Sequence, residues 1–349
     1  MFGKSKKLAA IEARLADLDA SVRRLSDTVE AVAEAATKPR GVALLQSLGV
    51  TPERFLERYF QDASNEAYYA ALNGGIESLR ARPESLDLKS GLCRQIHFST
   101  DEFRYWTRAM GGVPTMHRKQ WEYFYVAQVL FEQGMLSVGK KGLAFAVGRE
   151  PLPALFAGFG CEVLATDQAE EAAVAEGWAQ TGQHSSQVEA LFHESVCSRE
   201  AFFSSVRYQS VDMNGIPREL AGQFDFCWSS CAFEHLGSIE HGLSFVERSI
   251  DTLVPGGVAV HTTEFNLSSN DDTFESPGLS IFRRRDLEDL TARLTADGHE
   301  VSPFDWSEGP GFAETVVDLP PYKASPHLKL KLDKYTCTSV GIIVRKKMA

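Results

Sequence analysis

Cysteines, basic residues and long apolar stretches are all scarce in this chain of 349 residues. The six cysteines form no CxxC pair and most stand in apolar, strand-like contexts, which favours buried free thiols over a zinc site. Lysine and arginine number 36 against 47 aspartates and glutamates, and the net charge of −11 argues against a basic face for DNA or RNA. No apolar stretch approaches the length of a membrane span.

A secretory signal is not expected either, since no apolar core follows the basic residues of MFGKSKK. With 44% hydrophobic and 24% charged residues, the chain has the composition of a soluble globular protein. We therefore expect a cytoplasmic protein with no nucleic-acid partner and no transmembrane segment. The length allows one large domain or two ordinary ones.

Apolar residues recur at alternating spacings of three and four near the N-terminus. They are Leu8, Ile11, Leu15, Leu18, Val22, Leu25, Val29 and Val32. This a/d pattern predicts a coiled-coil oligomerisation helix over residues 1–38 and a homo-oligomer through residues 8–32. An amphipathic helix that folds back on the body, and a coiled coil formed with another protein, stay open as alternatives.

Residues 41–137 are predicted to form a mostly helical region that acts as a lid or contacts the substrate. Aromatic residues such as Trp106 and Trp121 recur along it. Most of them are expected to pack against the main domain, and any that are exposed could stack on sugar rings. Arg118 is a weak candidate for binding an anionic substrate group, with a solvated helix face as the alternative.

From residue 138 onward, short apolar strands alternate with helices, which predicts a mostly parallel sheet with helices on both faces. Residues 142–167 run as a strand, a glycine turn at Gly148, a helix and a second strand that ends at Asp167. This order places a helix N-terminus and a carboxylate at the carboxyl edge of the sheet, where open α/β sheets bind ligands. Because such a carboxylate suits the hydroxyls of an adenosine ribose, a nucleoside-containing cofactor is expected.

Further markers follow in order along residues 138–349. They are Asp212 after the third strand, FDFCWSS at the fourth strand and Pro255-Gly256-Gly257 before the fifth. Together with Gly148 and Asp167, this series resembles the class I S-adenosylmethionine-dependent methyltransferases over roughly residues 140–346. The resemblance implies a seven-stranded Rossmann-like α/β sheet, with a last strand that runs antiparallel between strands five and six. It also implies S-adenosylmethionine as the cofactor.

The resemblance assigns residues to the cofactor site as well. Those predicted to bind the cofactor are Gly148, Glu150, Asp167, Asp212, Met213 and Ser229. Asp167 is expected at the ribose, and Asp212 beside the adenine amino group with Met213 against the ring. Glu150 is expected near the methionine ammonium group, which a carboxylate would neutralise.

The glycine loop departs from the family pattern. Ala144 stands at the usual acidic place, Ala146 replaces the first glycine, and Glu150-Pro151 replace the third. An NAD-dependent oxidoreductase is the competing interpretation, because Asp167 could hold an NAD ribose equally well. The loop, however, lacks the glycines that allow close approach to a pyrophosphate.

Two strand ends deliver histidine and glutamate to one edge of the predicted sheet. The fourth strand leads to Glu234 and His235, and the fifth leads to His261 and Glu264. A positioned base that takes a hydroxyl proton accelerates a reaction typically ~10²–10⁴-fold, so these four are the predicted catalytic residues. Alternatives stay open: His235 could orient a loop, His261 could be a satisfied core histidine, and Glu234 could pair with an arginine.

Weaker candidates complete the predicted site. His184 and Arg118 are candidates for substrate binding. No metal ligand is predicted, because His261, Glu264 and Asp271-Asp272 offer ligand atoms in no diagnostic spacing. A divalent metal stays an alternative to the metal-independent chemistry expected first.

The sequence therefore predicts an S-adenosylmethionine-dependent methyltransferase that acts on a hydroxyl of a sugar, a glycan or another polar acceptor. Histidine and glutamate near the site favour O-methylation, because a hydroxyl benefits from a base. The competing hypothesis from another class is a noncatalytic scaffold with the same fold, assembled by its coiled coil. The degenerate glycine loop is the observation that favours the scaffold.

Overall fold

The computed structural model describes residues 82–169, 187–323 and 325–349. Residues from Ser78 to Ala349 form one compact unit. The predicted coiled coil of residues 1–38, the first part of the predicted helical region and His184 lie outside the described residues. They stay predictions.

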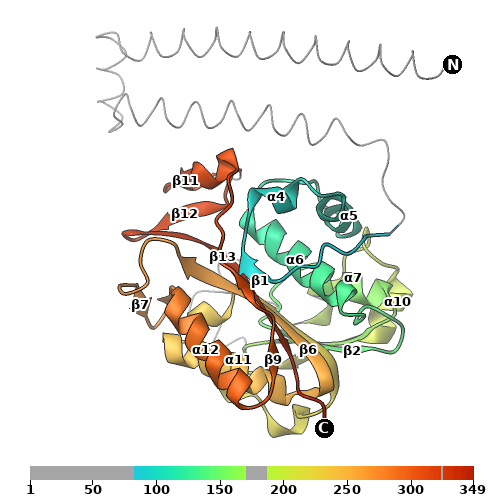
Figure 1. Cartoon of the computed structure of the whole chain (residues 1–349). Coiled ribbons are helices and arrows are strands. Elements are labelled where there is room, and N and C mark those ends of the chain that lie inside the picture. The colour runs from blue at the N-terminus through green and yellow to red at the C-terminus, as the bar shows by residue number, and fades with distance from the viewer. Residues whose placement is uncertain (1–81, 170–186, 324) are drawn as a thin grey trace, which may run out of the picture. The chain divides into compact units, whose positions relative to one another are not determined.

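One sheet of eleven strands runs through the described residues, and its central part is parallel (Figure 1). The parallel strands, in spatial order, are β4 (Val206–Ser210), β3 (Glu162–Asp167), β2 (Lys141–Phe145), β5 (Phe224–Ser230) and β6 (Leu253–Asn266). These are the first five strands that the sequence predicts. β2, β5 and most of β6 are buried, as strands covered on both faces must be.

The long last strand, β13 (Tyr335–Arg345), runs antiparallel to β6, and the pairing extends from Cys337 opposite Asn266 to Arg345 opposite Val258. The other edge of β13 pairs antiparallel with β9 (Glu300–Val301) and with β1 (Ser90–Leu92). The prediction of an antiparallel last strand between strands five and six is therefore confirmed.

The sheet differs from the seven strands predicted. The predicted strand from Val301 to Trp306 is split into β9 and β10 (Phe304–Asp305), and β10 pairs with β1. The other unpredicted pieces are β11 (Val317–Asp318) and β12 (Lys329–Leu332) in this sheet, and the hairpin of β7 (Glu275–Ser276) with β8 (Leu279–Ser280). Such pieces of two to four residues are too short for a hydrophobic period to mark them.

The α-helices in the described residues are α4 (Gln95–Phe98), α5 (Asp101–Ala109), α6 (Arg118–Glu132), α7 (Leu152–Gly158), α10 (Arg199–Ser205), α11 (Ile239–Asp251) and α12 (Arg284–Ala296). Short 3₁₀ turns are η1 (Val188–Leu191), η2 (Met213–Gly215), η3 (Arg218–Leu220), η4 (Phe233–His235) and η5 (Phe312–Thr315). Two of these turns, η2 and η4, follow β4 and β5 directly and so form part of the carboxyl edge of the sheet.

Helices cover both faces of the sheet (Figure 1). α6 packs against β5, β6 and β13, whereas α11 packs against β6 and α12. Successive side chains of a strand point to opposite faces. Glu264 of β6 accordingly meets Arg118 on α6, and His261, three residues earlier, meets Ser249 on α11.

The aromatic residues of α5 and α6 form core rather than surface. Phe103, Trp106, Trp121 and Phe124 are fully buried, and Tyr125 is 1% exposed. The prediction that most of this stripe packs against the main domain is confirmed. These five residues are therefore not available to stack on sugar rings, because the sheet and the neighbouring helix bury them.

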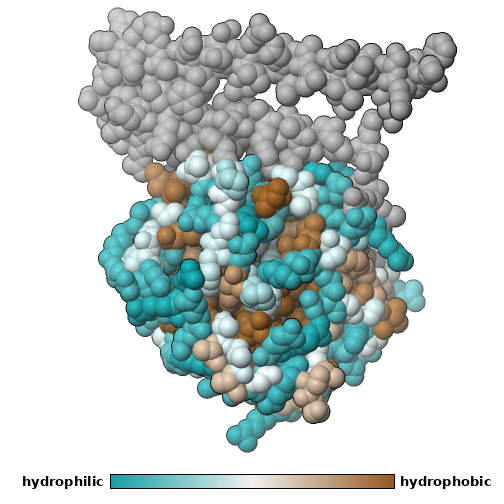
Figure 2. Space-filling model, viewed as in Figure 1, coloured by the Kyte–Doolittle hydropathy of each residue, from teal (hydrophilic) through white to brown (hydrophobic). Residues whose placement is uncertain are grey.

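The surface visible in Figure 2 is mostly hydrophilic, with scattered apolar patches. All six cysteines are free thiols, and Cys93, Cys161, Cys227 and Cys337 are buried, as predicted. Among the described residues, the helices are too short or too polar for any of them to span a membrane.

Candidate active site at the carboxyl edge of the sheet

The turn after β2 lies against the end of β3. The backbone N–H of Gly148 donates a hydrogen bond of 3.0 Å to Oδ2 of Asp167, and Gln168 N–H donates one of 2.9 Å to Oδ1. Gly148 has a φ of +51° and Ala146 one of +49°. Ala146 stands where the methyltransferase pattern has a glycine. It nevertheless adopts the left-handed conformation, which costs a residue with a Cβ about 1–2 kcal/mol.

The end of β4 carries the second predicted cofactor carboxylate. Asp212 is exposed and caps η2 by accepting a hydrogen bond of 2.8 Å from the N–H of Asn214. The neighbouring Met213 is buried. The structure thus brings Gly148, Asp167 and Asp212 to the ends of three adjacent parallel strands, β2, β3 and β4.

Glu150 lies beneath this edge rather than at its surface. It is 5% exposed, and its Oε1 accepts a hydrogen bond of 2.6 Å from the indole N–H of Trp228 on β5. Burial raises the pKa of Glu150 to about 7, and the Trp228 hydrogen bond opposes this shift.

His261 is fully buried with both ring nitrogens engaged. Its Nε2 lies 2.9 Å from the hydroxyl of Ser249, which donates its own proton to the carbonyl of Val246 and so accepts from His261. Its Nδ1, 2.8 Å from the hydroxyl of Ser229, is left as the acceptor. Burial lowers the pKa of His261 to about 3. This geometry favours the alternative that His261 is a core histidine. The side chain of Ser229, which was predicted to bind the cofactor, points into the same core.

The ends of β5 and β6 hold a buried network of charges that reaches across to α6. Glu264 is 4% exposed and forms an ion pair with Arg118 through Oε1. Arg118 also lies 3.5 Å from Glu122 Oε1 and donates to the hydroxyl of Ser339 at 3.2 Å. Desolvation raises the pKa of Glu264 to about 7, although the guanidinium lowers it.

Lys119 belongs to the same network. Its Nζ lies 2.8 Å from Oε2 of Glu122 and donates to the carbonyl of Ser230 at 3.1 Å. Arg118 is therefore not on a solvated helix face, because Glu264, Glu122 and Ser339 engage its guanidinium. Its role in substrate binding stays a prediction. Tertiary packing places this polar end of α6 against the ends of β5 and β6.

Glu234 and His235 sit on η4, directly after β5. Glu234 is 1% exposed and its Oε2 accepts a hydrogen bond of 3.0 Å from the hydroxyl of Thr263. His235 is about a quarter exposed; its Nδ1 lies 2.7 Å from the carbonyl oxygen of Gly278, and its Nε2 lies 3.9 Å from Oε1 of Glu234. Because a carbonyl only accepts, Nδ1 carries the proton and the lone pair of neutral His235 is on Nε2.

The network contains two residues that the sequence analysis did not select, namely Glu122 and Cys231. One signal was present for Glu122: a charged residue stands among the apolar residues Trp121, Phe124 and Tyr125 of a buried helix, four positions after Arg118. The set of His261, Glu264 and Asp271-Asp272 is not brought together as a metal site. His261 lies in the core, and Asp272 pairs with Lys334 at 2.8 Å.

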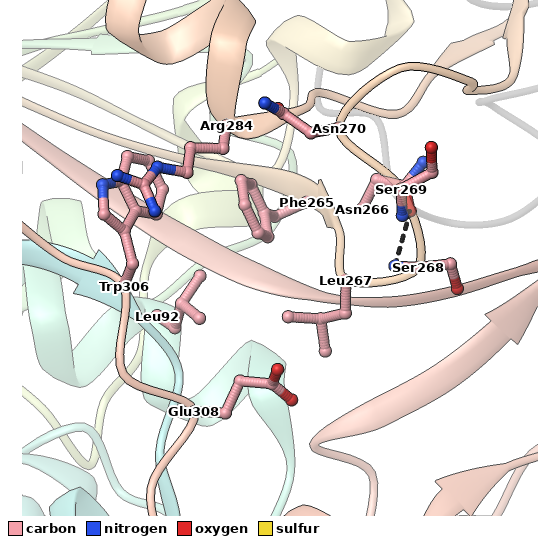
Figure 3. Close-up of a pocket in the computed structure, with 10 residues that line it drawn as sticks. All are labelled: Leu92, Phe265, Asn266, Leu267, Ser268, Ser269, Asn270, Arg284, Trp306 and Glu308. Atoms are coloured by element: carbon pink, nitrogen blue, oxygen red, sulfur yellow. Dashed lines mark hydrogen bonds between the residues drawn. The ribbon is translucent and has the colours of Figure 1, made fainter.

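A pocket of about 260 Å³ opens beyond the end of β6 (Figure 3). Its apolar wall is formed by Leu92, Phe265, Leu267 and Trp306, and its polar groups include Asn270 and Glu308. The guanidinium of Arg284 lies over the ring of Trp306, 5.3 Å from its centroid. Phe265 follows Glu264 in β6 and faces the opposite side of the sheet, so this pocket is separate from the Arg118–Glu264 network. It contains none of the predicted site residues.

Comparison with known proteins finds likenesses of fold only. No family model and no curated protein matches the chain. The CurJ carbon methyltransferase shares 13% identity at a TM-score of 0.35, with 66% of this chain and 54% of CurJ covered, so this chain spans about half of that protein. A 1,6-didemethyltoxoflavin-N1-methyltransferase of Burkholderia thailandensis, solved with S-adenosylhomocysteine, shares 15% at a TM-score of 0.39, with 63% and 76% covered.

A methyltransferase of Methanosarcina mazei described as S-adenosylmethionine-dependent shares 14% identity at a TM-score of 0.38, with 63% of this chain and 98% of that chain covered. The cyclase SpnF shares 16% at 0.41, with 75% and 100% covered. These values are too low to carry an assignment of activity. By its own strand order, with β13 antiparallel between β6 and β9, the chain has an α/β fold that resembles the Rossmann-like class I methyltransferases.

Proposed function

We propose that this protein is an S-adenosylmethionine-dependent methyltransferase that acts on a hydroxyl of a polar acceptor, in particular a sugar or glycan. The observation that carries the proposal is the pair of Glu234 and His235 at the end of β5, where the Gly278 carbonyl accepts the Nδ1–H of His235 and Nε2 is the nitrogen on the side of Glu234. Such a group is equipped to take a hydroxyl proton.

The cofactor part of the proposal is supported by the carboxylates at the ends of β3 and β4, beside the turn after β2. β2 lies between β3 and β5, so the chain switches direction across the sheet there, and open α/β sheets bind ligands at such a point. Asp167 is buried beside the Gly148 turn, and a carboxylate oxygen can accept a ribose hydroxyl in addition to a backbone N–H. These acceptor groups fit the hydroxyls and the amino group of a nucleoside. When bound, S-adenosylmethionine supplies an electrophilic methyl group on a sulfonium.

The proposed role of His235 follows from its contacts with Gly278 and Glu234. The Gly278 carbonyl orients the ring, and Nε2 would accept the proton that an acceptor hydroxyl loses as its oxygen is methylated. The carboxylate of Glu234, 3.9 Å from Nε2, would stabilise the imidazolium that forms. We assign no proton transfer to His261, because Ser229 and Ser249 already occupy both of its nitrogens.

The sugar part of the proposal draws only on the chemistry of the pocket beyond β6, which contains none of the predicted site residues. Phe265 and Trp306 offer aromatic surface, while Asn270 and Glu308 offer hydrogen-bonding groups, a combination suited to a polyhydroxylated molecule. The proposed homo-oligomer through residues 8–32 has its own test. Removal of residues 1–38 should lower the mass measured by light scattering.

Calorimetric titration with S-adenosylmethionine tests the cofactor. We expect binding by the full chain and a loss of about 1.5–3 kcal/mol in Asp167→Ala, because a hydrogen bond to a charged group is removed. Asp225→Ala is the matched control, since Asp225 pairs with Lys140 near the start of β5, away from the carboxyl edge. Absence of binding by the full chain would favour the noncatalytic scaffold instead.

Incubation with radiolabelled cofactor and a panel of acceptors tests the reaction. Label in the hydroxyl groups of oligosaccharides is the expected result. Label in amines or carbon acceptors, with none in hydroxyls, would overturn the O-methylation part and leave the cofactor part intact.

A further inference from the structure

Among the described residues, one group of side chains has the donor atoms and the spacing for a metal ion. The Sγ of Cys231 and one carboxylate oxygen each from Glu234 and Glu264 lie within 4.8 Å of one another. They come from three separate positions, the residue after β5, the turn η4 and the end of β6. The two glutamates are almost fully buried and Cys231 is half-buried.

The spacing agrees with tetrahedral coordination. With metal–sulfur and metal–oxygen bonds of about 2.3 Å and 2.1 Å, a thiolate sulfur and a carboxylate oxygen on one zinc ion would be about 3.6 Å apart. The Sγ of Cys231 and Oε1 of Glu264 are 3.8 Å apart. A shift of a few tenths of an ångström would therefore suffice for these two atoms.

A second observation, independent of the spacing, points to a missing partner. Oε2 of Glu264 is buried and accepts no hydrogen bond, although Oε1 of the same carboxylate is paired with Arg118. An unpaired buried carboxylate oxygen is costly, and a cation is the partner that offsets this cost best.

The balance of buried charge gives a third argument. Around this point the carboxylates of Glu122, Glu150, Glu234 and Glu264 stand against two cations, Arg118 and Lys119. With the Cys231 thiolate that metal binding requires, five negative charges stand against two positive ones, an excess of three. A divalent cation would lower this excess to one.

We propose that Cys231, Glu234 and Glu264 bind one divalent transition-metal ion of the zinc class, with a position left open for a further ligand. A thiolate with carboxylates suits a borderline-soft ion and not Mg²⁺ or Ca²⁺, which prefer oxygen ligands throughout. The guanidinium of Arg118, whose Nη1 lies 3.4 Å from Sγ, orients the thiolate from outside the coordination sphere. An ion held here lies beside His235 and polarises an oxygen at its open position.

The test uses Co²⁺ as the probe, with the full chain free of any histidine tag and without S-adenosylmethionine. We expect a thiolate-to-cobalt charge-transfer absorption that saturates at one equivalent and disappears when Zn²⁺ is added. Cys231→Ser should abolish the absorption, and Glu264→Gln should weaken Co²⁺ binding about tenfold or more. Cys197→Ser is the matched control, because this half-buried thiol lies outside the group, and the absorption should persist.

Two results would overturn the proposal. One is no charge-transfer absorption at a millimolar concentration of Co²⁺, and the other is an absorption that survives in Cys231→Ser. Circular dichroism without metal shows whether Cys231→Ser is folded. If it is not, Co²⁺ binding is measured in Glu234→Gln, where it should also be weakened. Cofactor binding is measured separately, so a chain that binds S-adenosylmethionine but no Co²⁺ refutes the metal site alone.

Discussion

The two halves of the carboxyl edge are built in different ways. At the ends of β2, β3 and β4, carboxylates meet backbone amides, as Asp167 does with Gly148 and Asp212 with Asn214. At the ends of β5 and β6, carboxylates meet side-chain cations from α6, as Glu264 does with Arg118. The first half depends on local loop geometry, whereas the second depends on a helix from a distant part of the chain. Substitutions elsewhere in the fold are therefore expected to disturb the ends of β5 and β6 more than the ends of β2, β3 and β4.

The largest expected effect concerns the proposed base. His235→Gln should lower the turnover number about 10²–10⁴-fold, because proton transfer is lost while Gly278 and the rest of η4 keep their places. His241→Gln, at an exposed histidine of the next helix, serves as the control. The measurement is turnover at saturating cofactor, with calorimetry to show that cofactor affinity is unchanged. Full turnover in His235→Gln would remove the base from the proposal.

The next largest effect concerns the ion pairs that α6 forms with the end of β6. Arg118→Met should destabilise the fold by about 3–5 kcal/mol, because it leaves Glu264 and Glu122 buried without their guanidinium partner. Arg104→Met, which removes a partly exposed pair with Asp101, should cost less than about 1 kcal/mol. Urea unfolding monitored by fluorescence measures both. Equal losses in the two variants would show that the network adds nothing beyond an ordinary surface pair.

The last prediction concerns the pH dependence of stability, where the effect within any one pH unit is the smallest of the three. The folded pKa of His261 is about 3 and its ordinary value is 6.5, so between these values the unfolded chain binds a proton that the folded chain excludes. Stability is lost as pH falls from 6.5 toward 3, by up to about 1.4 kcal/mol per pH unit for this one group. The free energy of unfolding of His261→Gln should therefore vary less with pH in that window. If the free energy of unfolding changed equally with pH in the unaltered chain and in His261→Gln, the buried neutral histidine would be contradicted.

The sheet itself was readable because its strands are long or continuously apolar. β2, β3, β5 and β6 and the antiparallel β13 all fall where the sequence predicts them. β1 and β10 were not predicted, since a strand of two or three residues carries no period and exists only through its pairing with β13 or with each other. A strand can therefore be predicted from sequence only when it is long enough to show a hydrophobic pattern.

Candidate residues show the same division. Glu234, His235, Asp167 and Asp212 were placed at strand ends by counting along the chain, and they lie there. His261 was also placed near a strand end, but only the tertiary structure shows that β6 continues to Asn266 and turns this histidine toward α11. A side chain's face depends on register, and one residue of register reverses it.

What the sequence by itself determined was therefore the order of strands and helices and the presence of carboxylates at the sheet's edge, because both follow from local hydrophobic pattern and turn chemistry. Only the tertiary structure decided which charges face one another. Arg118 and Glu264 are far apart along the chain, and Cys231 meets Glu264 only because β5 and β6 are neighbours in the sheet. Long-range pairing of this kind arises from the packing of α6 on the sheet, and no local pattern records it.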